Sequence, residues 1–340
     1  RFLTGFSMIG ILIIVESWLN DRATNKTRGK VLSLYMFFTF FAFTIGNLLL
    51  NIGSRNSYEP FILISLLFSV ALIPILLTKR KPPTFKKTSS IRIKELLKIS
   101  PFGSFSMFCT GFIFAAMFAM LSVYAVTMNL TVFEISILLV GTTLAGAIFQ
   151  WPIGYLSDKY DRRVIVIGCC ISSFIFGVLS IMSSGIYFES LVAEEMVRFN
   201  YFSSDGNMNK TNLFIFIILL SGMTLPMFAL NLALVNDYIP KEKFVAAGAG
   251  LNIIFGLGAM AGPIICSVLM SLLGPNGFFI HLFIFLLAII FFGIYRVNKR
   301  EYEDNPESTF TPLPREITPL GIELDPDTGV DLSNTPNDKK

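Results

Sequence analysis

The sequence predicts an all-α membrane protein with about nine transmembrane helices. The first observation is composition, since 53% of the 340 residues are hydrophobic, 15% are charged and the mean hydropathy is +0.66. The second is length, because uncharged runs near the roughly 20 residues that a bilayer-spanning helix needs recur along the chain. The third is pattern, because these runs lack the alternation that transmembrane β-strands show. A water-soluble fold is excluded.

The apolar runs give the spans in order. The predicted spans cover about 2–19, 31–50, 60–78, 102–128, 135–156, 164–183, 212–235, 245–273 and 278–295. Only the first span contains an acidic residue, Glu16. Thr131 and Glu134 have the spacing of a capping box and predict the outer start of the fifth span.

Basic residues predict the orientation of these spans. Twenty Lys and Arg residues fall in one set of alternating connections and three in the other. Because basic residues favour the cytoplasmic side, we expect a cytoplasmic C-terminus and an external residue 1. We also expect a multi-pass protein of the cell (inner) membrane.

An internal repeat predicts how the spans are grouped. A shift of 216 residues places Leu19-Asn20-Asp21 on Val235-Asn236-Asp237, each at the inner end of a span. The first three spans then pair with the last three, so symmetry predicts twelve helices in two six-helix halves, three of them upstream of Arg1. The expected organisation is as follows: 1–78, the last three helices of the N-terminal half; 79–101, a cytoplasmic linker; 102–296, the six-helix C-terminal half; 297–340, a disordered cytoplasmic tail.

Three segments outside the predicted spans differ in composition from the short connections: the linker, one long outer loop and the C-terminal tail. The linker contains an amphipathic stretch at 91–98 that predicts a short interfacial helix, with a solvated basic loop as the alternative. The outer loop 185–211 is a candidate for a short surface helix. The tail holds six of the sixteen prolines and many acidic residues without a hydrophobic period, which is typical of disorder.

A ten-residue motif separates the fifth and sixth spans. The segment Gly154-Tyr-Leu-Ser-Asp158-Lys159-Tyr-Asp161-Arg162-Arg163 resembles the G-x-L-x-D-[RK]-x-[GD]-R-[RK] signature of the major facilitator superfamily. Glycine permits close helix approach, and the carboxylates and guanidinium groups can pair at the membrane surface. The alternative is a set of ordinary positive-inside anchors. The resemblance implies that the motif belongs to the inner gate of a transporter.

Further motifs extend this resemblance over residues 1 to 300. In the eighth span, Gly258-x-x-x-Gly262-Pro263 matches a helix-packing motif of the superfamily. The segments Val15-Glu16-Ser17, Arg28-Gly29-Lys30 and Gln150-Trp151-Pro152-Ile153-Gly154 resemble the YcaD-like transporters of bacteria. This resemblance implies a permease that lacks its first three transmembrane helices, and it leaves the substrate open.

Glu16 is the leading candidate for a coupling site, because charge at membrane depth is costly and usually functional. One interpretation is a proton or cation site that lines the central cavity. The other is a structural partner for Arg28 or for basic residues of a missing loop, in a closed inner gate. Five other polar residues could face a substrate or could join helices: Tyr35, Tyr124, Gln150, Asn231 and Asn252.

The remaining signals exclude other classes of function. The four cysteines lie in apolar segments and His281 is the only histidine, so we expect no metal, no cofactor and no enzyme site. Basic residues form no single surface, so nucleic acid is not an expected partner. No G-x-x-x-x-G-K-[ST] motif is present, so a gradient must drive transport. The predicted function is a secondary active transporter in the lipid bilayer that moves a small solute by alternating access, with protons as candidate coupling ions. The alternatives are a facilitative uniporter and a transporter-like sensor or scaffold.

Overall fold

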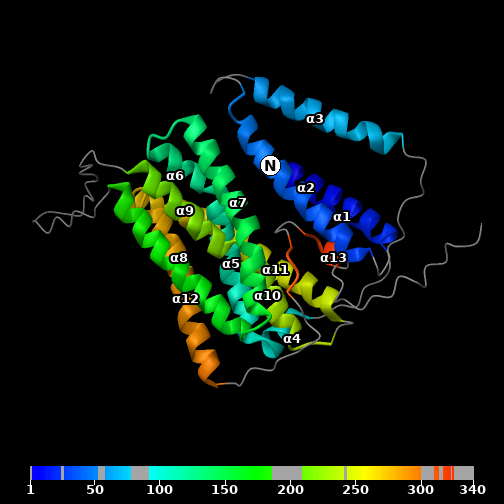
Figure 1. Cartoon of the computed structure of the whole chain (residues 1–340), viewed down its shortest axis with the longest axis vertical. Coiled ribbons are helices and arrows are strands. Elements are labelled where there is room, and N and C mark those ends of the chain that lie inside the picture. Colours follow the sequence, from blue (N-terminus) through cyan, green and yellow to red (C-terminus); the bar gives the residue numbers. More distant parts are fainter. Residues whose placement is uncertain are drawn as a thin grey trace, which may run out of the picture.

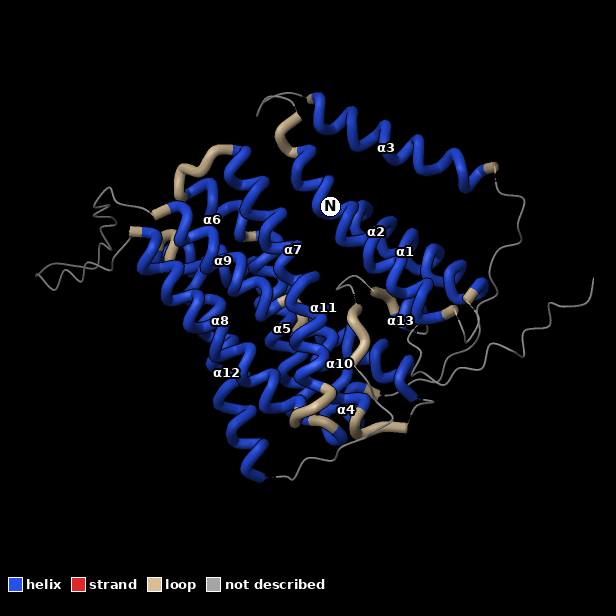
Figure 2. Tube along the Cα trace, in the orientation of Figure 1, coloured by secondary structure: helices blue, strands red, loops and turns tan. Residues whose placement is uncertain are grey.

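The computed structural model describes residues 2–23, 27–52, 58–77, 92–185, 209–240, 243–299, 310–313, 317–322 and 324. Within these ranges the chain is helical, and helices and their connections account for the whole architecture (Figures 1 and 2). The helices are α1 Phe2–Arg22, α2 Arg28–Leu49, α3 Glu59–Leu76, α4 Ile93–Ile99, α5 Pro101–Ala119, α6 Leu121–Thr127, α7 Val132–Ser157, α8 Arg162–Ser184, α9 Lys210–Thr224, α10 Met227–Asn236, α11 Phe244–Leu273, α12 Gly277–Lys299 and α13 Pro319–Ile322.

The helices coincide with the predicted spans. Seven helical segments in the described part of the chain are long and apolar enough to cross a membrane, and shorter apolar helices at Leu3–Leu19 and Glu59–Ile73 fall on the first and third predicted spans. Two spans are interrupted. The fourth consists of α5 and α6, which meet at Met120, and the seventh consists of α9 and α10, which meet at Leu225 and Pro226. Hydropathy alone gives no sign of these interruptions.

Local signals explain where several helices begin and end. Pro101 occupies the first turn of α5, where a missing N–H costs nothing. At the start of α7 the predicted capping box is confirmed, since Thr131 accepts from the Glu134 N–H and the Glu134 carboxylate accepts from the Thr131 N–H. Asp161 caps α8, and Gly185 ends that helix with a φ of 68°, which glycine adopts without strain.

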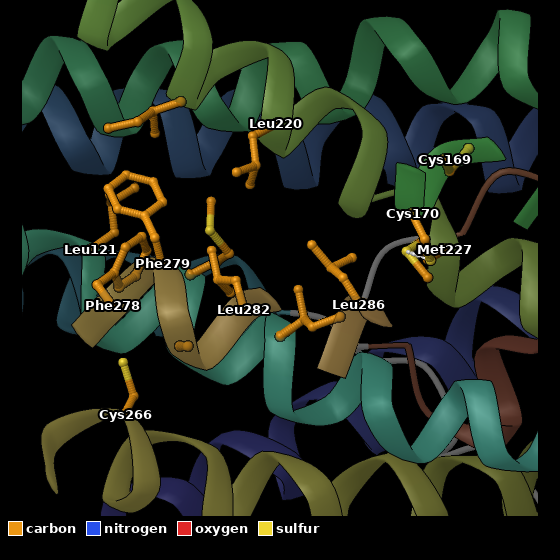
Figure 3. Close-up of a cluster of buried hydrophobic side chains, with 14 of the residues drawn as sticks. Leu121, Cys169, Cys170, Leu220, Met227, Cys266, Phe278, Phe279, Leu282 and Leu286 are labelled. Carbon is orange, nitrogen blue, oxygen red and sulfur yellow. Dashed lines mark hydrogen bonds between the residues drawn. The ribbon is translucent and has the colours of Figure 1, made fainter. Parts of the chain in front are cut away.

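The second half of the chain, α5 to α12, forms a packed bundle around an apolar core. Helix α8 lies against α9 and α12, and α7 lies against α9. Figure 3 shows the core between these helices, where Phe278, Phe279 and Leu282 of α12 face Leu121 and Leu220. All four cysteines are buried and unpaired, and all four belong to this core, where Figure 3 shows Cys169, Cys170 and Cys266.

Helices α5 and α11 approach each other closely along their backbones. A Cβ atom on Gly258 would lie 2.3 Å from the carbonyl oxygen of Phe108, and one on Gly262 would lie 2.9 Å from that of Phe112. On the facing helix, a Cβ on Gly111 would lie 2.2 Å from the carbonyl oxygen of Phe255. Small residues therefore let the two backbones touch, as expected for a motif that packs helices in membranes. Pro263 follows directly, inside α11.

Helices α1 to α3 lie on one side of this bundle (Figure 1). Helix α2 contacts α7, and α13 contacts both α1 and α11, so these two contacts join the first part of the chain to the second. The described side chains of α3 are exposed or half-buried, as expected for a helix that faces lipid. The short helix expected at 91–98 is present as α4, and its Leu96 is fully buried against Gly250 of α11.

The expectation that the whole tail lacks structure does not hold. Leu313, Ile317, Ile322 and Leu324 are at most 3% exposed and belong to an apolar cluster with residues of α1, α2, α10 and α11. Proline and acidic composition suggests disorder, but these scattered apolar residues find a surface that buries them. The remaining tail residues, most of the linker (79–91) and the outer loop from 186 to 208, with its expected helix, lie outside the described residues.

Candidate functional site

Glu16 lies at the centre of the polar contacts between α1, α2 and the tail. Its side chain is fully buried near the C-terminal end of α1. One carboxylate oxygen, Oε1, accepts a hydrogen bond of 2.8 Å from the Tyr35 hydroxyl. The other, Oε2, accepts from the backbone N–H groups of Thr318 (2.9 Å) and Gly321 (3.0 Å) and from the Thr318 hydroxyl. Four donors therefore replace the water that a carboxylate at this depth loses.

Helical spacing explains why Tyr35 reaches this carboxylate. Leu32 and Met36, one turn apart on α2, are both buried, and Tyr35 lies next to them on the same face. That face points toward α1 and the tail, while Phe37, Phe38 and Phe41 point outward and are more than half exposed. The partners of Glu16 are thus hydroxyl and amide groups. Arg28, the basic partner expected in a closed gate, has a side chain outside the described residues.

Gln150 and Asn252 also face the tail. The Gln150 side-chain amide donates to the carbonyl oxygen of Leu313 over 3.1 Å, and the Asn252 amide donates to that of Ile317 over 3.0 Å. These residues come from α7 and α11, so polar side chains of four helices meet along one short stretch of tail. Four of the six candidate cavity residues are brought together in this way.

Tyr124 and Asn231 lie elsewhere. Tyr124 is fully buried in the bundle core, where its ring centroid is 5.3 Å from those of Phe278 and Phe279. Asn231 of α10 donates to the Thr110 hydroxyl of α5 over 3.0 Å and joins those two helices. Their positions correspond to the helix-packing alternative rather than to contact with a substrate.

The motif between α7 and α8 forms a compact charge network. Arg162 is 2% exposed and donates to Asp158 over 3.0 Å, to the Ala233 carbonyl oxygen over 3.0 Å and to Asp237. Arg163 pairs with Asp161 at 2.7 Å, and the Lys159 ammonium lies 4.3 Å from the Tyr155 ring centroid.

The sequence predicted the acidic and basic residues of the loop but not the partner at the end of α10. Asp237 belongs to the repeated Val235-Asn236-Asp237 segment, and this repeat is the sequence signal that could have identified it as a partner of the loop. The network ties the α7–α8 turn to the C-terminal end of α10.

The motif also contacts the tail. Asp158 accepts a hydrogen bond of 2.8 Å from the Phe310 N–H. A Cβ on Gly154 would lie 2.2 Å from the Phe310 ring, so only glycine leaves room for this aromatic side chain. None of the tail residues in the site is predicted by the sequence, because their apolar positions follow neither a helical nor a strand period.

A cavity of about 220 Å³ lies between α2 and the second half of the chain. Its polar lining comes from α2, α6, α7 and α9, and consists of Asn47, Ser122, Thr142, Thr143 and Ser221. Leu225, at the break between α9 and α10, adds an apolar wall. Discontinuous helices commonly line the binding sites of transporters. The residues that line this cavity are all uncharged.

Two further hollows lie near this cavity, and residues of the tail line both of them. A narrow one of about 40 Å³ shares Phe43, Phe118, Thr143 and Leu225 with the larger cavity and has Leu313 of the tail in its wall. A wider one of about 550 Å³ lies between α2, α7 and residues 310–312. In the part of the chain that the structure describes, acidic, cysteine and histidine residues form no cluster that could hold a metal ion.

Comparison with known proteins agrees with this architecture. The profile of the Major Facilitator Superfamily matches residues 1–194 and, in a second stretch, residues 129–324. An uncharacterized MFS-type transporter YcaD of Escherichia fergusonii is 23% identical over 296 residues, which cover 85% of this chain and 70% of that protein.

An uncharacterized MFS-type transporter of Yersinia pestis is 24% identical over the same shares of the two chains. No solved structure matches. The family profile matches far more than half of the sequence, and its α-helical membrane architecture is that of the structure. The chain belongs to the Major Facilitator Superfamily.

Proposed function

We propose that this multi-pass membrane transporter is a secondary active permease that moves a small solute by alternating access and couples this movement to protons at Glu16. One observation carries the coupling role. Glu16 is a fully buried carboxylate whose described partners are hydroxyl and amide donors from two elements. Burial disfavours the charged carboxylate and these donors favour it, so a change in the donors would change how readily Glu16 takes up a proton. A fixed basic partner would instead hold the carboxylate charged throughout.

The cavity of about 220 Å³ supports a role in solute binding. It adjoins the breaks that separate α5 from α6 and α9 from α10, and it lies between α2 and the second half of the chain. Its hydroxyl and amide groups, together with Phe43 and Phe118, suit a small uncharged solute with a few hydrogen-bonding groups.

The proposed orientation rests on charge. The motif loop, the inner ends of α1 and α10 and the start of α11 all adjoin the connections that carry the twenty basic residues. We place this end, and with it the C-terminus, in the cytoplasm of a cell whose inner membrane holds the protein. Glu16 and the motif then lie on the cytoplasmic side of the solute cavity.

Reconstitution tests the proposal. Proteoliposomes are given a mixture of isotope-labelled small metabolites, with and without a pH gradient, and the lumen is analysed by mass spectrometry. We expect at least one solute to accumulate only with the gradient. Glu16→Gln should abolish this accumulation but leave exchange of the same solute across equilibrated membranes intact, because exchange needs no net proton release. A Glu16→Gln variant that accumulates and exchanges solute like the wild type would remove Glu16 from coupling.

The same experiment separates the alternatives. A facilitative uniporter would equilibrate the solute without response to the gradient. A sensor or scaffold would bind a solute without flux. If Glu16 instead stabilises a closed gate, Glu16→Gln should impair exchange and accumulation together.

A further inference from the structure

We propose that residues 310–313 and 317–322 of the tail bind within the same chain as a wedge between the two halves, and that this wedge must leave before the inner end of the transporter can close. The binding surface, here called the inner groove, is formed by Glu16, Gln150, Asp158, Gly248 and Asn252. Its occupant is present in the structure. The binding of the tail is independent of the proposed function, whereas the block of transport rests on it.

Polar side chains of the inner groove recognise the backbone of the tail. Asp158 and Glu16 accept from backbone N–H groups, and Gln150 and Asn252 donate to backbone carbonyl oxygens, at distances of 2.8 to 3.1 Å. These contacts extend from Phe310 to Gly321. Backbone N–H and C=O groups that are not fully paired within a helix, such as those just before α13 and in its first turn, need partners of this kind, so the groove has the chemistry of a peptide-binding site.

Apolar side chains of the tail fill the space beside these hydrogen bonds. Leu313 and Ile317 are 3% and 2% exposed, and Ile322 is 1% exposed. They lie in one apolar cluster with Leu32 of α2 and Leu251 of α11. Burial at this level is typical of core residues and indicates a docked segment rather than a loose surface contact.

Glycines on both sides of the contact leave the room that the tail needs. A Cβ on Gly248 of α11 would lie 2.4 Å from Ile322 Cδ1. A Cβ on Gly321 of the tail would lie 2.6 Å from the carboxyl carbon of Glu16. Larger side chains at either position would therefore separate the tail from the groove.

The position of the tail explains why it would block the cycle. Helix α13 contacts α1 in the first half and α11 in the second, so it holds these helices apart at the inner end. Leu313 also forms part of the wall of the narrow hollow that adjoins the solute cavity. Alternating access requires the two halves to approach at one end while they separate at the other. A docked tail prevents that approach and covers the route to the cavity.

The first test measures docking without any solute. In inside-out vesicles of the full chain, Ile322→Cys is labelled with a membrane-impermeant maleimide, and Pro312→Cys serves as an exposed position in the same tail. The native cysteines are buried, so the wild-type chain is the blank. We expect slow labelling at 322 and fast labelling at 312. Equal rates at the two positions would overturn docking.

Two variants designed to release the tail from the inner groove then test the wedge. Gly321→Val changes only the tail, and Gly248→Leu changes only the groove. We expect Gly321→Val to raise the labelling rate at 322 by about tenfold or more, since the docked state loses its close contacts. Gly248→Leu clashes with Ile322 itself, so its effect is measured with Ile322 intact and with Leu324→Cys, a fully buried position, as the reporter, where we expect a similar rise. Gly256→Leu on the same helix is the matched control, because a Cβ there meets nothing within 4 Å, and it should leave the rate unchanged.

The second test measures the route to the cavity. Thr143→Cys, in the wall shared by the two hollows, should be labelled from the inner side faster in the Gly321→Val background than in the unmodified one. Exposure of Ile322→Cys without faster labelling at 143 would overturn the wedge while leaving tail docking in place. If both cysteines respond but no solute of the metabolite mixture crosses the membrane in any background, the proposed transport function fails and the docked wedge stands.

Discussion

The hydroxyl of Tyr35 donates a hydrogen bond of 2.8 Å to the carboxylate of Glu16, and this bond joins α1 to α2. Both residues belong to the first half of the chain, so their bond can persist when the halves move relative to each other. The contacts of Glu16 with Thr318 and Gly321 connect it to the tail instead. One carboxylate therefore has a permanent partner on one oxygen and a removable one on the other.

Tyr35→Phe should destabilise the first half of the chain. The change removes a donor from a buried carboxylate, and such a loss costs about 1–3 kcal/mol. Thermal unfolding in detergent should show a lower midpoint than for the wild type. Tyr58→Phe is the control, since Tyr58 is 74% exposed, and an equal shift in the two variants would contradict the importance of the bond.

Arg162→Lys should also lower the unfolding midpoint. A lysine cannot reproduce the planar fork with which Arg162 reaches Asp158, Asp237 and the Ala233 carbonyl oxygen. Because lysine keeps the charge and can still pair with one carboxylate, the loss should be smaller than the about 3–5 kcal/mol that removal of one partner of a buried pair costs. Lys159→Gln, which changes an exposed charge of the same turn, provides the comparison and should have little effect on the same midpoint.

Asp158→Asn should slow transport while solute affinity is nearly kept. The carboxylate pairs with Arg162 and accepts from Phe310, and it lies outside the lining of the solute cavity of about 220 Å³. A change of charge there biases one packing of the inner end over the other without contact with solute. Uptake rates at several solute concentrations, with cysteine accessibility of the cavity, provide the measurement. A large loss of affinity with unchanged accessibility would argue against a gating role.

Gly258→Val should disrupt the contact of α5 with α11. The new side chain would meet the Phe108 carbonyl oxygen at 2.3 Å, and a helix backbone cannot move aside as a side chain can. Overpacking of this kind costs about 1–3 kcal/mol. Gly256 lies on a different face of α11, where a Cβ would meet open space, so Gly256→Val should unfold at nearly the wild-type temperature. The two unfolding curves compare a packed and an open position in the same helix.

The sequence predicted the spans well because burial in a bilayer imposes a simple requirement of length and hydropathy. The capping box at Thr131 and Glu134 was also predicted correctly, since it depends only on two residues that are three positions apart. The orientation of individual side chains was harder to predict. Tyr124 and Gln150 are both polar residues in apolar spans, yet one lies in the core and the other contacts the tail. A span that is hydrophobic all round gives no stripe from which to tell these faces apart.

The docked tail was not predictable from local pattern. Leu313 and Ile317 are separated by a proline and by charged residues, and the apolar residues of the tail follow neither a helical nor a strand period. Its stability depends on groups contributed by α1, α7 and α11, which are distant in sequence. Local residue propensity could suggest only disorder. Most of the residues that hold the tail in place lie 150 or more positions away in the sequence.

The break at Pro226 gives the seventh span two mechanical parts. A proline at this position lacks the N–H that would continue the helix ladder, so α9 and α10 can bend against each other. Helix α10 is tied by Arg162 to the turn before α8, whereas α9 lies along α8 and α7. We therefore expect α10 to tilt relative to α9 about Pro226, with its C-terminal end held by the charged turn. Such a tilt would deform the wall of the solute cavity at Leu225.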